Sequence, residues 1–240
     1  SLFSGIGGID LGLERAGMEI AWQVEFDPWC RRVLEKHWPE VPKYVDVKDV
    51  GTKNLEPVDL VAGGFPCQDV SNAGRREGIQ GERSGLWFEF ARIIREVRPR
   101  YILVENVPGL LVRGMDAVLS ELAQSGYDAE WDCIPASAVG APHIRDRVFV
   151  LAYSEKPRRL YRILEDGISC QERREASMGQ FGRMACPETW LEAVTEYGRA
   201  DDGVPARVDR LRGLGNAVVP QVVEWIGRQI AKHAASEHSQ

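Results

Sequence analysis

Cys67 is the side chain in this sequence whose setting most suggests chemistry. It follows Gly63-Gly64-Phe65-Pro66, and that stretch follows the apolar run 58–62, which is typical of a buried strand. Proline fixes the backbone just before the thiol, at a strand end of the kind where open α/β sheets bind ligands. Cys67 is therefore a candidate nucleophile. The alternative is a cysteine packed as a small hydrophobe, since free cysteine is among the most buried residue types.

A carboxylate and two guanidiniums accompany other apolar runs. Glu105 ends the run 101–104, and glutamate is rarely buried without a partner or a task. Arg145 and Arg147 precede the run 148–151. Strand alternation predicts that both guanidiniums lie on one face, about 6–7 Å apart.

A glycine turn near the start of the chain suggests a nucleotide-like ligand. Gly5-Ile6-Gly7-Gly8 precedes a predicted helix, and the predicted strand 20–24 then ends at Glu25. Strand, glycine turn, helix, strand and acid is the layout of a nucleotide-binding half-sheet. The dinucleotide pattern GxGxxG fails because Asp10 occupies the place of its third glycine. Glu25 does not discriminate between cofactor classes, because a carboxylate there can accept hydrogen bonds from ribose hydroxyls in either.

Apolar periodicity predicts the elements that hold these residues. Further helices are expected over 27–37, from Ser84 to about 97, over 110–125 and from about 218 to 230, with strands at 44–45 and 127–134. Asp27 is expected to cap its helix, with Trp29 and Val33 facing inward.

Composition sets broad limits. The chain has 240 residues, 44% hydrophobic and 28% charged, with a formal net charge of −6. No apolar run approaches the roughly 18 residues that cross a membrane, so a cytoplasmic protein is expected. The five cysteines form no C-x-x-C pair, so neither a zinc site nor a disulfide framework is indicated, and no metal is expected. The segment 156–183 carries seven basic and four acidic residues, which suits contact with nucleic acid or an ordinary solvated surface.

Five short motifs, in order, resemble those of the DNA (cytosine-5) methyltransferases. They are Phe3-Ser4-Gly5-Ile6-Gly7-Gly8, Pro66-Cys67-Gln68, Glu105-Asn106-Val107, Arg145-Asp146-Arg147 and Gly215-Asn216. The resemblance covers nearly the whole chain except roughly 154–205. It implies an α/β fold: a Rossmann-like, S-adenosylmethionine-dependent methyltransferase sheet with helices on both faces and a small inserted target-recognition region. The implied divisions are a catalytic and cofactor-binding domain at 1–153, the recognition region at 154–206, and a segment returning to the catalytic domain at 207–240.

The resemblance also implies catalytic roles. Cys67 adds to C6 of a cytosine flipped out of duplex DNA, Glu105 protonates N3, and Arg147, supported by Arg145, donates to the exocyclic oxygen. S-adenosyl-L-methionine supplies the methyl group and leaves as S-adenosyl-L-homocysteine.

Further residues are implied to bind the cofactor or DNA. The cofactor set is Phe3, Gly5, Ile6, Gly7, Glu25, Phe26, Asp46, Val47, Pro66, Leu86 and Asn216. The DNA set is Gln68, Ser71 and Arg75. The alternative to cofactor contact is core packing for Phe26 and a helix N-cap for Asp46. The family usually has glutamine where this chain has His143, and the alternative is that His143 is a surface residue without a role in the site. Serine is frequent in the family where this chain has Ala217.

Several functions fit this reading. The main one is a sequence-specific, bacterial or phage-encoded DNA methyltransferase that acts as a monomer, with a cognate restriction endonuclease as a possible partner and no membrane contact. An RNA (transfer RNA) cytosine-5 methyltransferase is the nearest alternative, because the recognition region is short. A catalytically silent DNA-binding homologue and a nicotinamide oxidoreductase are the others, disfavoured respectively by the intact Cys67 and Glu105 and by Asp10.

Overall fold

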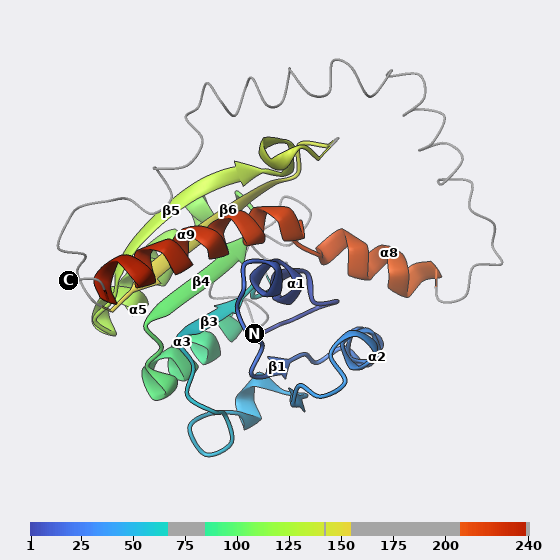
Figure 1. Ribbon diagram of the computed structural model, residues 1–240, viewed down its shortest axis with the longest axis horizontal. Helices are drawn as coiled ribbons and strands as arrows, with labels where there is room; N and C mark the ends of the chain where they lie inside the picture. Colours follow the sequence, from blue (N-terminus) through green and yellow to red (C-terminus); the bar gives the residue numbers. More distant parts are fainter. Residues whose placement is uncertain (67–84, 142, 155–206, 239–240) are drawn as a thin grey trace.

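The computed structural model describes residues 1–66, 85–141, 143–154 and 207–238 (Figure 1). Its β-sheet has two parts, which the start of the chain joins. Strands β1 (Gln23–Val24) and β2 (Lys43–Tyr44) pair in parallel. A four-stranded part has the order β3 (Leu60–Gly63), β4 (Tyr101–Asn106), β6 (Asp146–Tyr153) and β5 (Asp128–Pro135). Leu2 bridges in parallel to Val24 and to Gly63, and so lies between the two parts.

Strand β6 runs against its neighbours. It pairs antiparallel with both β4 and β5, whereas β3 pairs in parallel with β4. In the β4–β6 register Glu105 lies opposite Phe149, so Arg147 lies on the same face two residues along β6. The carboxyl ends of the parallel strands and the amino end of β6 therefore share one edge of the sheet, where α/β folds place their ligands.

Helices cover both faces of this sheet. The α-helices are α1 (Gly8–Arg15), α2 (Pro28–His37), α3 (Leu86–Val97), α4 (Leu110–Arg113), α5 (Met115–Gln124), α8 (Arg207–Asn216) and α9 (Pro220–His238), and short 3₁₀ turns are η1 (Val47–Asp49) and η3 (Ala136–Val139). Figure 1 shows α9 lying across one face beside α1, and these two helices share a buried apolar cluster with that face. The cluster on the opposite face includes α3 and α5.

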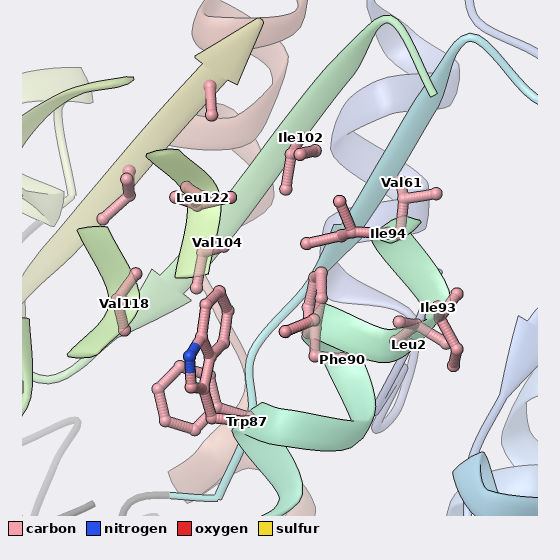
Figure 2. Packing of buried hydrophobic residues seen from close by; sticks show 14 of the residues in the cluster. Leu2, Val61, Trp87, Phe90, Ile93, Ile94, Ile102, Val104, Val118 and Leu122 are labelled. Carbon is pink, nitrogen blue, oxygen red and sulfur yellow. The ribbon is translucent and has the colours of Figure 1, made fainter. Parts of the chain in front are cut away.

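Alternation along β4 divides the core between the two faces. Ile102 and Val104 belong to the α3 cluster, whereas Tyr101 and Leu103 belong to the α9 cluster. Figure 2 shows Phe90 and Ile94 of α3 packed toward the sheet. Fully buried side chains of this size contribute about 1.5–3 kcal/mol each. The apolar stripe of α3 thus fixes the helix on the sheet and holds β4 beneath it.

The structure corrects several sequence-based expectations. The helix predicted over 110–125 is two helices, because Gly114 has φ 156° and separates α4 from α5. The strand predicted over 20–24 is only β1. Helix α2 buries Cys30 and Leu34, while Trp29 and Val33 are half-buried. Among the described residues, no helix has the length and apolarity needed to span a membrane.

Candidate active site

A cleft of about 790 Å³ opens at the sheet edge where the parallel strands end. Its lining comes from the segments 3–9, 24–30, 45–48, 64–66, 105–107 and 209–218, together with Leu86 and Arg147. This volume lies in the range of about 300–1,000 Å³ that is usual for small-molecule sites. The cleft is therefore large enough for a nucleoside-sized ligand.

The glycine turn is tied to the acid that ends β1. Gly5 has φ 56°, a left-handed conformation, and its N–H donates to Oε2 of Glu25 at 2.7 Å. The N–H of Asp27 donates to Oε1 of the same carboxylate at 2.7 Å. Burial raises the pKa of Glu25, and these two backbone hydrogen bonds act in the opposite direction. Each carboxylate oxygen can accept a second hydrogen bond, so Glu25 can still bind a ligand hydroxyl.

Residues expected at the cofactor largely gather around this cleft. Those that line it are Phe3, Gly5, Ile6, Glu25, Phe26, Asp46, Val47, Pro66, Leu86 and Asn216. Gly7 does not line it. A Cβ on Gly7 would lie 2.4 Å from the ring of Trp38, so this glycine permits the close packing of Trp38 behind the turn.

The structure bears on the alternatives to cofactor contact at Phe26, a core position, and at Asp46, a helix cap. Phe26 is 72% exposed and lines the cleft, so it is not a core residue. Asp46 caps η1 by accepting a hydrogen bond from the N–H of Lys48 at 2.9 Å, and it also lines the cleft. The capping role leaves its second carboxylate oxygen available to a ligand amino group.

Glu105 and Arg147 form an ion pair at the inner end of the cleft. The Nε of Arg147 lies 2.9 Å from Oε1 of Glu105, and their side chains are 19% and 12% exposed. Gly64 adjoins the same carboxylate, since a Cβ there would lie 2.6 Å from Oε2. Burial raises the pKa of Glu105 to about 7, although Arg147 and Arg145 lower it. Desolvation therefore outweighs the two cations, and the carboxyl group can hold or release a proton near neutral pH.

Arg145 lies before β6 rather than in it. Its φ is 38° and β6 begins at Asp146, so the predicted strand alternation does not govern its side chain. The Nη2 of Arg145 donates to the carbonyl of Gly215 at 2.8 Å and to that of Ala217. Arg145 thereby ties the start of β6 to the junction of α8 and α9, while remaining close enough to lower the pKa of Glu105.

Cys67, Gln68, Ser71 and Arg75 lie outside the described residues. The preceding segment is fixed to the end of β4, because the buried Asn106 donates from Nδ2 to the carbonyl of Phe65 at 3.3 Å. Its Oδ1 accepts from the N–H of Val107 at 2.8 Å. Asn106 thus links the backbone leading to Cys67 with β4, the strand that carries Glu105. His143 is exposed, in agreement with the surface position that was its alternative.

Lining residues that the sequence analysis did not assign to the site include Trp29, Lys48, Asp209 and Gly213. A Cβ on Gly213 would lie 2.7 Å from the ring of Trp29, so this glycine lets α8 pack closely on α2. Helical spacing places Asp209 one turn before Gly213 on the same side of α8. No helix was predicted over 207–216, so no helical periodicity indicated this close packing. Within the described ranges, no cluster of histidine, cysteine and acidic side chains could hold a metal ion.

Comparison with known proteins supplies an independent test of the family. The profile of the C-5 cytosine-specific DNA methylase family matches residues 1–181. Type II methyltransferase M2.BsuMI of Bacillus subtilis (strain 168) is 42% identical over 160 residues, covering 63% of this chain and 41% of that protein. Type II methyltransferase M.DsaV of Dactylococcopsis salina is 35% identical over 161 residues, covering 65% of this chain and 45% of that protein.

Structural similarity extends over the whole fold. The methyltransferase EhMeth of Entamoeba histolytica matches with a TM-score of 0.66 and 14% identity, covering 100% of this chain and 98% of that one. At this identity the match shows the fold alone, a Rossmann-like methyltransferase fold. The alignments with M2.BsuMI and M.DsaV span less than half the length of those proteins. The profile match over three quarters of the sequence nevertheless shows that this chain belongs to the C-5 cytosine-specific DNA methylase family.

Proposed function

We propose that this protein transfers a methyl group from S-adenosylmethionine to C5 of cytosine in duplex DNA. The observation that carries the proposal is the ion pair between the buried Glu105 and the half-buried Arg147, both of which line the cleft. The pair lies beside Gly64, and the chain reaches Cys67 three residues later. An acid with a pKa near neutrality, a fixed cation and a nearby thiol are the groups that this reaction needs.

The cleft suits S-adenosylmethionine as cofactor. Glu25 would accept hydrogen bonds from the ribose hydroxyls, and Phe26 offers an exposed aromatic face for adenine. Asp46 and Val47 would meet the adenine edge, with Leu86 beside it. Ile6 and Asn216 also line the cleft. Bound S-adenosylmethionine supplies an electrophilic methyl group carried on a sulfonium.

The protein's own groups would activate the base. Cytosine C5 is a poor nucleophile, and addition of the Cys67 thiolate at C6 converts the ring to an enamine. Glu105 gives a proton to N3 as the carbon–sulfur bond forms, and Arg147 donates to the exocyclic oxygen as negative charge develops there. After C5 has gained the methyl group, a base removes the C5 proton. The electron pair of that C–H bond then re-forms the ring double bond between C5 and C6 as the thiolate is expelled, and N3 returns its proton to Glu105.

The target cytosine has to leave the duplex for this chemistry. A stacked base presents neither C6 nor N3 to groups inside a cleft, so the nucleotide must be flipped out at a cost of a few kcal/mol. Gln68, Ser71 and Arg75, together with the basic segment 156–183, are the proposed DNA contacts that offset this cost. Action on one base at a time is compatible with a cytoplasmic monomer, with or without a cognate endonuclease.

The deciding experiment measures methyl transfer from labelled S-adenosylmethionine into unmethylated duplex DNA, followed by base-resolution mapping of 5-methylcytosine. Complete methylation of one short sequence is the expected result. Transfer to structured RNA in preference to duplex DNA would favour the RNA methyltransferase instead. Cofactor binding without transfer to either nucleic acid would contradict the proposed activity and favour a catalytically silent homologue.

A further inference from the structure

Arg92 of α3 binds the segment that follows β2. Its Nη2 donates to the carbonyl of Val47 at 3.0 Å and to that of Val50 at 2.9 Å. Its other nitrogens are held within α3, since Nε donates to Glu89 at 2.8 Å and Nη1 to Glu96 at 2.8 Å. Each of the three guanidinium nitrogens therefore has an oxygen partner, and the side chain has one fixed orientation.

The same segment is held a second time through Glu96. Its Oε2 accepts from the N–H of Thr52 at 3.2 Å, while Oε1 accepts from Arg92. The approach is close because residue 51 is glycine: a Cβ there would lie 2.1 Å from Oε2 of Glu96. The hydrogen bond from Arg92 lowers the pKa of Glu96, so this carboxylate stays ionised at neutral pH. Arg92 and Glu96 together clamp the backbone from Val47 to Thr52 onto α3.

The clamped segment forms one wall of the cleft. Asp46 and Val47 line the cleft. Val47 is the first residue of the 3₁₀ turn η1, and its carbonyl accepts the hydrogen bond from Arg92. Arg92 itself is not part of the cleft lining. Its contact with the ligand site is therefore indirect, through the backbone that presents these two residues. The first residue of α3, Leu86, lines the cleft as well, so one helix supports two parts of this wall.

We propose that Arg92 is a positioning residue for the cofactor: it holds the turn at Val47–Val50 so that Asp46 and Val47 face the adenine edge. This inference rests on the proposed function, because it takes S-adenosylmethionine as the occupant of the cleft. Nη2 donates to both carbonyl oxygens while Nε and Nη1 donate to two carboxylates, so the arrangement needs three nitrogens in one plane. A lysine ammonium at this position supplies the charge without the planar geometry that reaches both carbonyls and both carboxylates.

The test compares Arg92→Met and Arg92→Lys with Arg95→Met. Methionine keeps an unbranched aliphatic stem and removes every donor. Arg95 is a matched control, because it lies on the same helix and pairs at 2.6 Å with Glu121 of α5, away from the cleft. For each protein, calorimetry gives the Kd of S-adenosylmethionine and S-adenosylhomocysteine, and kinetics give KM and kcat with duplex DNA.

Arg92→Met is expected to raise both Kd values and the cofactor KM about tenfold, the effect of losing one or two charged hydrogen bonds. At saturating cofactor kcat should stay near the wild-type value, because Arg92 does not approach the reacting groups. Arg92→Lys should weaken binding nearly as much, whereas Arg95→Met should leave Kd and KM unchanged. Unaltered cofactor affinity in Arg92→Met would overturn the inference. Equal weakening in Arg95→Met would also overturn it, because the effect would then be general destabilisation.

Glu96→Gln keeps the proposal testable if Arg92→Met fails to fold. The amide keeps one accepting oxygen, so it can serve Arg92 or the N–H of Thr52 but not both, and it loses the charge that holds Arg92. A smaller rise in Kd is expected, with kcat again unchanged. No rise in Kd in Glu96→Gln and Arg92→Lys together would reject the clamp. The wild-type protein separates this inference from the proposed function. If it binds no S-adenosylmethionine, both fail; if it binds and these variants bind equally well, only the role of Arg92 fails.

Discussion

Arg147 and Glu105 meet at 2.9 Å across the antiparallel pair β4 and β6, although they come from distant parts of the sequence. Burial still raises the pKa of Glu105 to about 7 in spite of this cation. The carboxyl group is therefore partly protonated at neutral pH, as a group that gives a proton to N3 of cytosine must be.

We expect the pH dependence of kcat to follow the ionisation of Glu105. Because the proposed mechanism uses the protonated form of Glu105, we expect kcat to fall as pH rises above about 7. Glu105→Gln should remove that falling limb and lower kcat at neutral pH by about 10²-fold or more, since an amide cannot give up the proton. A pH–rate profile of both proteins with saturating DNA and cofactor measures this. Persistence of the limb in Glu105→Gln, or an equal loss of DNA affinity, would contradict the assignment.

Stability should depend on the same carboxyl group. Its pKa is raised in the folded state, so its favourable contribution is fully present below pH 4.5 and is lost as pH rises through about 7. A rise from 4.5 to about 7 corresponds to about 3 kcal/mol. The free energy of unfolding of Glu105→Gln, relative to wild type, should therefore increase by about that amount between these pH values. Urea titrations at several pH values test this, and a constant difference would mean that folding does not shift the pKa.

Gly64→Ala tests the packing behind the carboxylate. The added Cβ would lie 2.6 Å from Oε2 of Glu105, so the side chain of Glu105 or the backbone must move. We expect a loss of about 1–3 kcal/mol in stability together with a large fall in kcat.

Gly17→Ala is the control for this prediction. Gly17 has φ 89° and open space around it, so alanine costs about 1–2 kcal/mol through backbone strain alone. Chemical denaturation and kcat should separate the two variants: both lose stability, and only Gly64→Ala loses turnover. Similar kcat values in the two would show that the position of the carboxylate is unimportant.

Cys67→Ala should abolish methyl transfer while leaving the Kd of S-adenosylmethionine largely unchanged, because the thiol adds to the base and not to the cofactor. Cys133→Ala is the matched control. Cys133 lies on β5, and burial raises the pKa of its thiol, so it is a poor source of thiolate. Full activity is expected in the control, and measurable turnover in Cys67→Ala would exclude the covalent mechanism.

Local patterns in the sequence predicted much of the fold and part of the site. The apolar periodicity of α3, the cap at Asp27 and the acid after β1 depend on neighbouring residues only, and the structure confirms these features. The contact between Glu105 and Arg147 depends on the register of two strands far apart in the sequence, which no local pattern gives.

The errors have equally specific causes. Arg145 was placed in a strand, but its left-handed backbone directs the guanidinium to carbonyls of the α8–α9 junction. Gly114 breaks a helix whose apolar period continues across it. The role of Arg92 was not visible, because its carbonyl partners lie in a turn without periodicity.

The direction of β6 places its two ends at opposite ends of the sheet. Arg147 lies at the cleft, whereas Tyr153 pairs with Tyr101, the first residue of β4, at the other end of the sheet. Strand β6 therefore ends at Tyr153, away from Glu105 and Arg147, and after Ser154 the chain is next described at Arg207, in a helix that borders the cleft. Insertions or exchanges between these two points need not disturb any hydrogen bond of β6. Under the proposed function, a change of target sequence or of length within 155–206 would therefore leave the hydrogen bonds between β4, β5 and β6 intact.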